Sequence, residues 1–221
     1  MKNVNKILSI IQPSFFPYHG HFDIISKSDK YIFYDHVQYD KHGWRNRNRI
    51  VINGNMKWIT VPVNIDKTKI IKNVVIFRPE HSLRKIFKTI KQAYSKAKNF
   101  KIITNLIEEI FFEKNWLYIS DFNINATKKI CKFLNIKTEF YKSSDFINTK
   151  DKNINIVKLC QKLNCTSYLS GQLAKNYLDV KLFKENSIDL RWHEYEPIIY
   201  NQINVKNFLP RLSIIDYLYN K

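Results

Sequence analysis

The pattern of apolar and polar positions predicts a β-α-β unit at the start of the chain. Residues 7–11 are almost continuously apolar and end at Gln12-Pro13, which is typical of a parallel strand covered on both faces. A short helix is predicted over residues 21–28. A second buried strand follows over residues 31–34 and ends at Asp35.

A β-hairpin is predicted after the second strand. Residues 50–52 and 58–61 are rich in β-forming side chains and surround Asn53-Gly54-Asn55, whose Asn-Gly step is typical of a tight turn. Residues 74–77 predict one further strand.

The middle of the chain has helical periodicity. Apolar residues recur every three or four positions over residues 83–97 and 102–111, and less regularly over residues 124–134. Later, a helix at residues 156–163 is flanked by predicted strands at residues 138–141, 167–170 and 188–195. We therefore predict an α/β fold with a mainly parallel Rossmann-like sheet, flanking helices, a β-hairpin after the second strand and a helical middle segment. We expect a single domain over residues 1–221, with the helical insertion at roughly residues 80–135.

The chain is strongly basic, with a formal net charge of +18. Lysine is spread through every segment together with Asn and Ile, which favours a solvated surface shaped by compositional bias over a polyanion-binding face. Only 7 of the 37 basic residues are Arg, and three of those lie together as Arg45, Arg47 and Arg49. This cluster is more informative than the total charge.

Three cysteines without a Cys-x-x-Cys pair indicate neither a disulfide framework nor a zinc site, as expected in a reducing cytoplasm. No apolar stretch approaches the ~20 residues of a membrane span. We expect a cytoplasmic protein, or one peripheral to the inner membrane, without a transmembrane segment.

The densest group of polar residues follows the first predicted strand. In open α/β sheets, ligands bind beyond the carboxyl ends of the strands, where the next helix begins. Gln12, His19, Gly20 and His21 are expected there. Either imidazole could act as acid, base or phosphate contact, or one ring could only cap the helix. Asp23 and Asp35 could complete a metal site only if the fold joined them, and we predict none.

A second group follows Asp35, the residue at which the second strand ends. Arginine beside an aromatic ring is suited to phosphate or carboxylate recognition and also to stacking on nucleic-acid bases. The same residues could instead form a basic hairpin edge that discourages strand pairing between chains. The substrate-binding candidates are Gln38, Lys41, Trp44, Asn46 and Arg47.

A third group lies after the predicted strand at residues 167–170. Ser170 and Gly171 could hold a polar ligand group, with Tyr177 nearby, or could simply turn the chain. No Gly-x-Ser-x-Gly elbow, phosphate-binding loop or His-Glu-x-x-His motif occurs, which excludes several hydrolases, kinases and zinc proteases.

Several separated motifs resemble the WbqC-like family from end to end. They are Gln12-Pro-Ser-Phe-Phe-Pro17 with Gly20 and Phe22; Asp35 with Val37-Gln-Tyr39; Trp44-Arg-Asn-Arg-Asn-Arg-Ile50; Trp58-Ile-Thr-Val-Pro62; Tyr168-Leu-Ser-Gly171 with Ala174 and Tyr177; and Leu209-Pro-Arg-Leu-Ser-Ile-Ile-Asp216. His21 departs from the Tyr that is frequent in the family after the glycine.

The resemblance implies a transferase of bacterial O-antigen-type polysaccharide biosynthesis that attaches an acyl or aminoacyl group, such as glycyl, to a sugar. We expect Arg47 and Lys41 to hold phosphate or carboxylate while His19 or Asp35, ranked above His21, removes a proton from the acceptor. The expected donor is a thioester, an aminoacyl compound or a nucleotide, on an acidic carrier such as coenzyme A, a carrier protein or transfer RNA. The expected acceptor is a sugar nucleotide or a lipid-linked sugar.

Two alternatives stay open. Tyr18-His-Gly-His21 is similar to the His-x-Gly-His motif of nucleotidylyltransferases, which also follows a first strand, but Tyr18 replaces the leading His or Thr. This similarity supports the fold more than the reaction, and a nucleotide-binding transferase that activates its substrate is the first alternative. The second alternative is a nucleic-acid-binding module that uses the Arg cluster and surface lysines.

Overall fold

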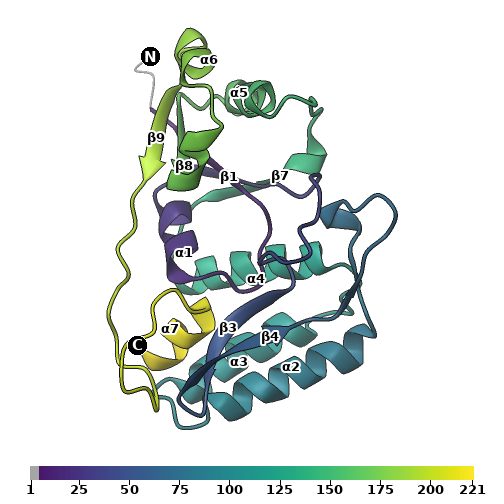
Figure 1. The fold of residues 1–221 in the computed structure, drawn as a ribbon, viewed down its shortest axis with the longest axis vertical. Coiled ribbons are helices and arrows are strands. Elements are labelled where there is room, and N and C mark those ends of the chain that lie inside the picture. The colour runs from purple at the N-terminus through teal and green to yellow at the C-terminus, as the bar shows by residue number, and fades with distance from the viewer. Residues whose placement is uncertain (1–4) are drawn as a thin grey trace. The chain divides into compact units, whose positions relative to one another are not determined.

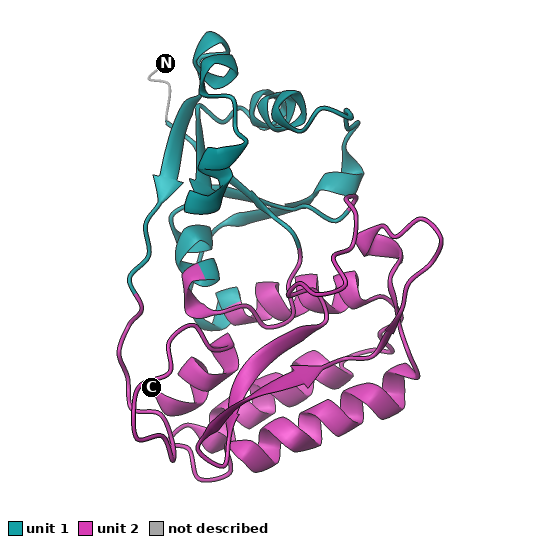
Figure 2. Ribbon diagram, viewed as in Figure 1, with its two compact units in different colours: residues 1–12, 21–35, 131–196 teal, residues 13–20, 36–130, 197–221 magenta. Residues whose placement is uncertain are grey.

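The computed structural model describes residues 5–221, so the first four residues of the predicted 1–221 domain lie outside the description. The chain forms two compact units, coloured separately in Figure 2. Unit 1 contains the residues up to Gln12, then His21–Asp35 and Cys131–Glu196. Unit 2 contains Pro13–Gly20, His36–Ile130 and Pro197–Lys221. Each unit is described by itself.

Unit 1 is built on a five-stranded parallel sheet in the order β7-β2-β1-β8-β9. Chain order runs outward from β1 to β7 on one side and from β8 to β9 on the other, which is the doubly wound arrangement. The strands are β1 (Ile7–Ile11), β2 (Lys30–Phe33), β7 (Glu139–Lys142), β8 (Ser167–Gly171) and β9 (Asp189–His193).

Helices cover both faces of this sheet (Figure 1). Leu8, Ile32 and Tyr168 pack with apolar residues of α5 (Lys152–Lys162) and α6 (Val180–Glu185) in one buried cluster. On the other face, the rings of Tyr31, Phe33 and Phe140 contact one another, and His21 of α1 (His19–Ser26) bonds the Tyr31 hydroxyl. Burial on both faces explains why the central strands are nearly continuous in apolar residues.

Unit 2 contains the predicted hairpin, formed by β3 (Arg47–Ile52) and β4 (Asn55–Thr60). Both turn residues, Asn53 and Gly54, have positive φ, as a type I′ turn requires. A side chain at Gly54 would also meet the Asn204 carbonyl oxygen at 2.5 Å, so the close approach needs glycine as well. A second antiparallel pair joins β5 (Val63–Asn64) and β6 (Val75–Ile76).

The helices of unit 2 enclose an aromatic core. Phe122 on α4 contacts Phe15, Phe16, Phe111 and Trp116, all of them buried. The helices are α2 (Pro79–Ala93), α3 (Phe100–Phe112), α4 (Ile119–Phe133, up to Ile130 in this unit) and α7 (Ile214–Asn220). Short 3₁₀ turns lie at Ile71–Asn73 in unit 2 and at Ser143–Asp145 and Gln172–Asn176 in unit 1.

The predicted fold class is confirmed: a mainly parallel sheet with flanking helices, a hairpin after the second strand and a helical middle segment. Several helix boundaries differ from the sequence prediction. The first helix spans His19–Ser26, two residues earlier than predicted at both ends, and the helix predicted over residues 156–163 begins at Lys152. The apolar pattern predicted a helix as far as residue 97, but α2 ends at Ala93. Tyr94 has a non-helical φ of −106°, although its ring is buried.

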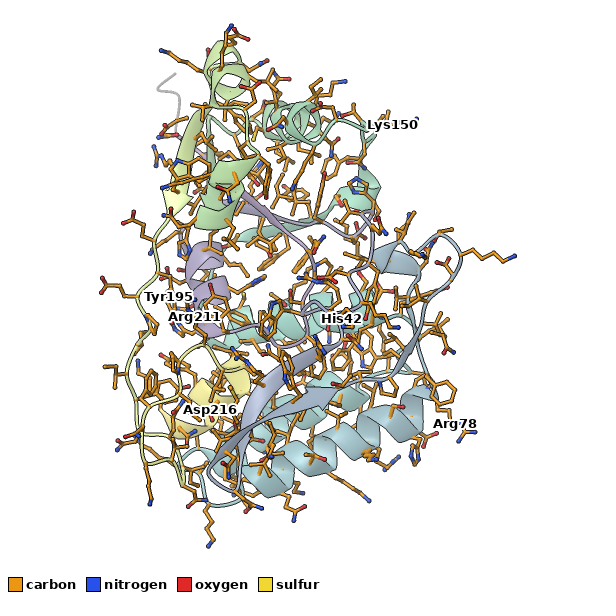
Figure 3. All side chains as sticks on the ribbon, in the orientation of Figure 1. His42, Arg78, Lys150, Tyr195, Arg211 and Asp216 are labelled. Atoms are coloured by element: carbon orange, nitrogen blue, oxygen red, sulfur yellow. The ribbon has the colours of Figure 1, made fainter. Side chains whose placement is uncertain are left out.

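A buried carboxylate ties α7 into unit 2. Asp216, labelled in Figure 3, is fully buried and accepts hydrogen bonds from the Tyr94 hydroxyl at 2.8 Å and the Tyr200 hydroxyl at 2.7 Å. Gln202 Nε2 donates a third bond at 3.0 Å. Burial raises the pKa of Asp216 above its ordinary value, although these three hydrogen bonds oppose the rise.

The raised pKa of Asp216 predicts a pH-dependent difference between the wild type and Asp216→Asn. The native chain binds this proton more tightly than the unfolded chain, so the contribution to stability is complete below the ordinary pKa of 3.8 and is lost as pH rises through the folded-state pKa. Because asparagine cannot ionise, the Tm of Asp216→Asn should improve relative to wild type as pH rises from about 3 to 7. Calorimetry at each pH measures this, and a difference that is independent of pH would contradict it.

Candidate functional site

Polar residues lie at the carboxyl end of every strand in the unit 1 sheet. Ligands of doubly wound sheets bind at this edge, because the strand ends and the following helices leave polar backbone groups free there. In spatial order from β7 to β9, the residues at the strand ends or within two residues of them are Ser143, Asp35, Gln12, Ser170 with Gly171, and His193.

The order of strands reverses between β1 and β8, so the crevice expected at such a switch point lies beside Gln12 and Gly171. Gly171 is exposed, and a Cβ built on it would meet no atom within 4 Å. Ser170 directly before it is buried. The edge is therefore open at Gly171, one of the three residues, with Gln12 and Ser170, from which the sequence predicted ligand contacts.

Asp35 connects the ends of β2 and β7. One carboxylate oxygen accepts from the Ser143 hydroxyl and the Ser144 backbone N–H, both at 2.9 Å, and the other accepts from the Ser144 hydroxyl at 2.8 Å. The Asp35 side chain is almost fully buried. These contacts favour a role in holding the edge in shape, and the predicted proton-abstracting role of Asp35 stays a prediction.

A network of amides continues from this corner toward α5. Asn148 donates to the Ser143 carbonyl at 2.7 Å, and Asn155 donates to Asn148 at 3.0 Å and to the Tyr34 hydroxyl at 3.2 Å. The loop after β7 is thus fastened to the helix that follows it. Tyr177 lies further along the unit, half exposed, with the Lys152 ammonium 3.5 Å from the centre of its ring.

The two predicted histidines belong to different units. His21 in unit 1 is buried, and its Nε2 lies 2.9 Å from the Tyr31 hydroxyl of β2, which favours a structural role. His19 in unit 2 is partly exposed, and its ring centre lies 4.5 Å from that of Tyr217 on α7. Gly20 follows it and is buried.

The outer face of the β3–β4 hairpin and the residues just before it carry two exposed tryptophans and two half-buried arginines, here named the Trp–Arg surface: Trp44, Arg47, Arg49 and Trp58. The Trp44 and Trp58 ring centres are 5.2 Å apart, and both side chains are at least 40% exposed. The guanidinium carbon Cζ of Arg47 lies 4.6 Å from the Trp58 ring centre. Arg49, directly opposite Trp58 in the hairpin register, lies 5.3 Å from the Trp44 ring centre.

The other residues of the second predicted group divide by exposure. Lys41 is exposed, and Gln38 lies in an extended segment that bridges to Ile70. Asn46 is buried and donates to the Val61 carbonyl at 2.8 Å, while its side-chain oxygen has no partner among the described residues. Arg45 is also buried and donates to the Pro13 carbonyl, so the arginine cluster of the sequence separates into one inward and two outward side chains.

The predicted residues therefore form two groups. Unit 1 holds Gln12, His21, Asp35, Ser170, Gly171 and Tyr177, whereas unit 2 holds His19, Gly20, Gln38, Lys41, Trp44, Asn46 and Arg47. A single pocket made from both sets stays a prediction.

The sequence did not single out two residues of the sheet edge, Ser143 after β7 and His193 at the end of β9. His193 has a charged partner. Its Nε2 lies 2.6 Å from Oδ2 of Asp23 on α1, in the same unit. The only sequence signal for His193 is its place in the last predicted strand, at residues 188–195. Its partner Asp23 is 170 residues away in sequence, so local pattern does not reveal the pair.

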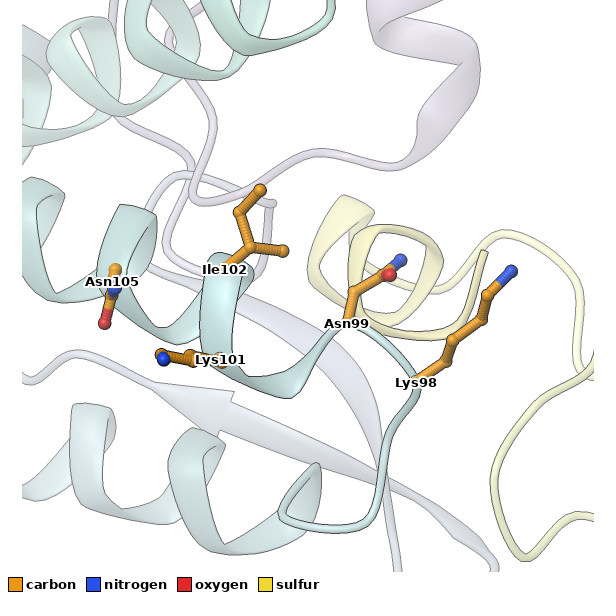
Figure 4. Close-up of a pocket in the computed structure, with 5 residues that line it drawn as sticks. All are labelled: Lys98, Asn99, Lys101, Ile102 and Asn105. Atoms are coloured by element: carbon orange, nitrogen blue, oxygen red, sulfur yellow. The ribbon is translucent and has the colours of Figure 1, made fainter.

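A hollow at the start of α3 contains none of the predicted residues (Figure 4). Its lining includes Lys98 and Asn99, whose side-chain nitrogens already bond the carbonyl oxygens of Lys221 and Leu218. The three cysteines are free and buried, and burial raises the pKa of Cys131 to about 12, so its thiol is a poor nucleophile at neutral pH. Among the described residues, no group of three His, Cys, Asp or Glu side chains could hold a metal ion.

Comparison with known proteins agrees with the motifs. The model of the WbqC-like protein family matches residues 12–221. The chain belongs to the WbqC-like protein family. The "Uncharacterized protein Rv1507c" of Mycobacterium tuberculosis (strain ATCC 25618 / H37Rv) is 33% identical to this WbqC-like chain over 218 residues, which cover 97% of the chain and 94% of that protein. No solved structure matches this WbqC-like chain significantly.

Three motifs that carry the family resemblance meet inside unit 2 of this WbqC-like chain. Asn48 Nδ2 donates to the carbonyls of Phe15 and Phe16 at 3.0 and 2.7 Å. The Ser213 hydroxyl donates to the Phe16 carbonyl at 2.8 Å, which helps to hold Phe16 at a positive φ of 40°. These residues therefore have a structural role inside unit 2.

No helix among the described residues is long and apolar enough to cross a membrane.

Proposed function

We propose that this WbqC-like chain is a transferase of bacterial surface-polysaccharide biosynthesis that attaches an acyl or aminoacyl group, such as glycyl, to a sugar. The family resemblance implies this reaction class. The observation that carries the proposal is the carboxyl edge of the unit 1 sheet, where a polar residue lies at the end of each of the five parallel strands or within two residues of it. The activated donor binds at the centre of this edge, beside Gln12, Ser170 and Gly171.

The Trp–Arg surface of unit 2 supports binding of a sugar that carries an anionic group. An exposed indole face is suited to the apolar face of a sugar ring, and guanidinium groups pair with phosphate or carboxylate in bidentate geometry. In this proposal Arg47 and Lys41 bind the anionic group of donor or acceptor, and Trp44 offers its exposed ring to the sugar. The remaining predicted contacts, Gln38 and Asn46, belong to the same segment of unit 2.

The distribution of charge supports an acidic carrier for the donor. Unit 2 contains 22 of the 37 Lys and Arg residues but only 8 of the 19 Asp and Glu residues, so most of the net positive charge belongs to it. Coenzyme A, an acyl carrier protein and aminoacyl transfer RNA are all acidic and would associate faster with such a surface. A sugar nucleotide or a lipid-linked sugar is the proposed acceptor.

Deletion of the gene tests the proposed function. Mass spectrometry of the surface polysaccharide should show the loss of one acyl or aminoacyl group per modified sugar, and the wild-type gene should restore it. Arg47→Ala should restore it poorly, whereas Arg84→Ala, an exposed arginine on α2 of the same unit, should restore it fully. Identical polysaccharide masses with and without the gene would reject the proposal.

A nucleotidylyltransferase-like activity is the second candidate, and one observation favours it. The His-Gly-His sequence of residues 19–21 forms the first turn of α1, directly after the loop that follows the first strand, which is where a nucleotide phosphate meets a helix N-terminus in doubly wound folds. Thermal stabilisation by ATP or another nucleoside triphosphate, together with release of pyrophosphate in the presence of a sugar phosphate, would establish this activity. Absence of both would dismiss it.

A further inference from the structure

His193 and Asp23 form a histidine–carboxylate pair at the ligand-binding edge of unit 1. His193 is the last residue of β9 and pairs in register with Gly171, the residue at the open centre of the edge. The His193 Nε2 to Asp23 Oδ2 distance is 2.6 Å, and the two side chains are 7% and 24% exposed. Imidazole and carboxylate are therefore in direct contact and largely shielded from water.

The contact with Asp23 orients the His193 imidazole. Gln172 Nε2 donates to the backbone carbonyl of His193 at 3.3 Å, and the Tyr195 ring lies nearly parallel to the imidazole with ring centres 6.3 Å apart. Nδ1 of His193 makes no hydrogen bond to any other residue that the structure describes. One ring nitrogen is thus engaged by the carboxylate, and the other is left for a group from outside the chain.

Asp23 does not need His193 to neutralise its negative charge. Asp23 Oδ2 already accepts a hydrogen bond from Lys27 at 2.7 Å, so the carboxylate has a permanent cation beside it. Burial raises the pKa of Asp23, but the hydrogen bonds from Lys27 and His193 outweigh it and leave this pKa below its ordinary value. Asp23 is therefore ionised at neutral pH and holds the Nε2 proton, which leaves the lone pair of Nδ1 to act as a base.

We propose that His193 is the general acid–base residue of the unit 1 sheet edge and that Asp23 is its positioning residue, an inference that rests on the proposed transferase function. In the first step, the acceptor hydroxyl or amine attacks the acyl carbon of the donor and its proton passes to His193 Nδ1. In the second, the tetrahedral adduct collapses, the bond from the acyl carbon to the sulfur or oxygen of the carrier breaks, and the leaving group takes the proton from Nδ1. The products are the acylated sugar and the protonated carrier, and the imidazole is regenerated neutral.

Three variants of the full chain separate this role from a structural one. In His193→Gln, the new amide nitrogen can still donate to Asp23, so the contact is kept and the titrating group is removed. Asp23→Asn removes the charge of the partner and keeps its shape. His81→Gln makes the same change as the first variant at an exposed histidine of α2 and serves as the matched control.

The expected result is that His193→Gln and Asp23→Asn lower polysaccharide modification in the complemented deletion strain by about 100-fold or more. His81→Gln should match the wild type, and all three variants should keep the wild-type circular dichroism spectrum. Full modification by His193→Gln would overturn the proposal, because transfer would then proceed without an imidazole to accept and return the proton.

NMR of ¹⁵N-histidine-labelled protein gives a readout that is independent of the transfer reaction. In the neutral form of His193, the ring nitrogens should report a proton on Nε2 and none on Nδ1, because the ionised Asp23 carboxylate holds the Nε2 proton. Asp23→Asn should weaken this tautomer preference, and a His193 proton on Nδ1 in the wild type, or the same tautomer mixture in both proteins, would overturn the proposal. If gene deletion leaves the polysaccharide unchanged, the transferase function fails separately, and this tautomer measurement alone decides whether Asp23 positions the imidazole as a base.

Discussion

Phe122→Ala is expected to lower the free energy of unfolding by about 3–5 kcal/mol. The Phe122 side chain is fully buried, and its ring centre lies 5.1 Å from that of Phe111, 5.6 Å from Trp116 and 5.9 Å from both Phe15 and Phe16. Truncation leaves a cavity that four aromatic rings cannot fill by small movements, so lost burial and the empty volume both contribute. Two of these rings, Phe15 and Phe16, belong to the segment that follows the first strand.

Urea unfolding followed by tryptophan fluorescence measures this effect, since three of the four tryptophans lie in unit 2. Phe77→Ala, at an exposed position in the same unit, is the matched control and should cost less than about 1 kcal/mol. Equal losses in the two variants would contradict the assigned centre of the unit 2 core.

The second large effect is expected for Asn48→Ala, at about 2–4 kcal/mol. The Asn48 side chain is 2% exposed and donates to two backbone carbonyls, those of Phe15 and Phe16, while its oxygen accepts from the Arg49 backbone N–H at 2.8 Å. Alanine leaves the two carbonyls and the Arg49 N–H without this hydrogen-bond partner. A buried polar group without a partner loses its hydration and gains no bond in return, which lowers the free energy of unfolding. It also releases a restraint on Phe16, whose positive φ is strained for a bulky residue.

Two further variants identify the source of the Asn48 effect in the same urea experiment. Asn48→Asp keeps the acceptor for Arg49 but cannot donate, so it should be nearly as unstable as Asn48→Ala. Asn55→Ala, on the paired strand and exposed, should stay within about 0.5 kcal/mol of the wild type. A stable Asn48→Asp variant would show that the bonds to Phe15 and Phe16 contribute little.

The sequence predicts most of the strands, because burial on two faces leaves continuous apolar runs and the Asn53-Gly54 turn has a specific backbone requirement. The positions of Gln12 and Gly171 follow from the same reasoning, since each comes at the end of a predicted strand. The neighbours β1 and β8 are separated by roughly 155 residues, and local pattern contains no information about such pairing.

The side-chain partners of the candidate site could not be predicted in the same way. His193 and Asp23 are isolated in sequence, and only the parallel order of the sheet and the packing of α1 bring them together. The sequence groups Arg45, Arg47 and Arg49 as one cluster, suited to anion recognition, to stacking on nucleic-acid bases or to a basic hairpin edge. In the structure the strand alternation places Arg47 and Arg49 on the outer face with Trp58, whereas Arg45 lies before the strand and is buried.

Gly171→Leu tests most directly the central claim that the donor binds at the switch point of the unit 1 sheet. The position has room for a side chain and its φ of −70° is accessible to any residue, so the fold should keep its stability within about 0.5 kcal/mol. Lys184→Leu, exposed on α6, controls for an added surface leucine in the same unit. We predict that polysaccharide modification is lost in a deletion strain carrying Gly171→Leu and kept with Lys184→Leu. Full modification by a folded Gly171→Leu protein would contradict the account.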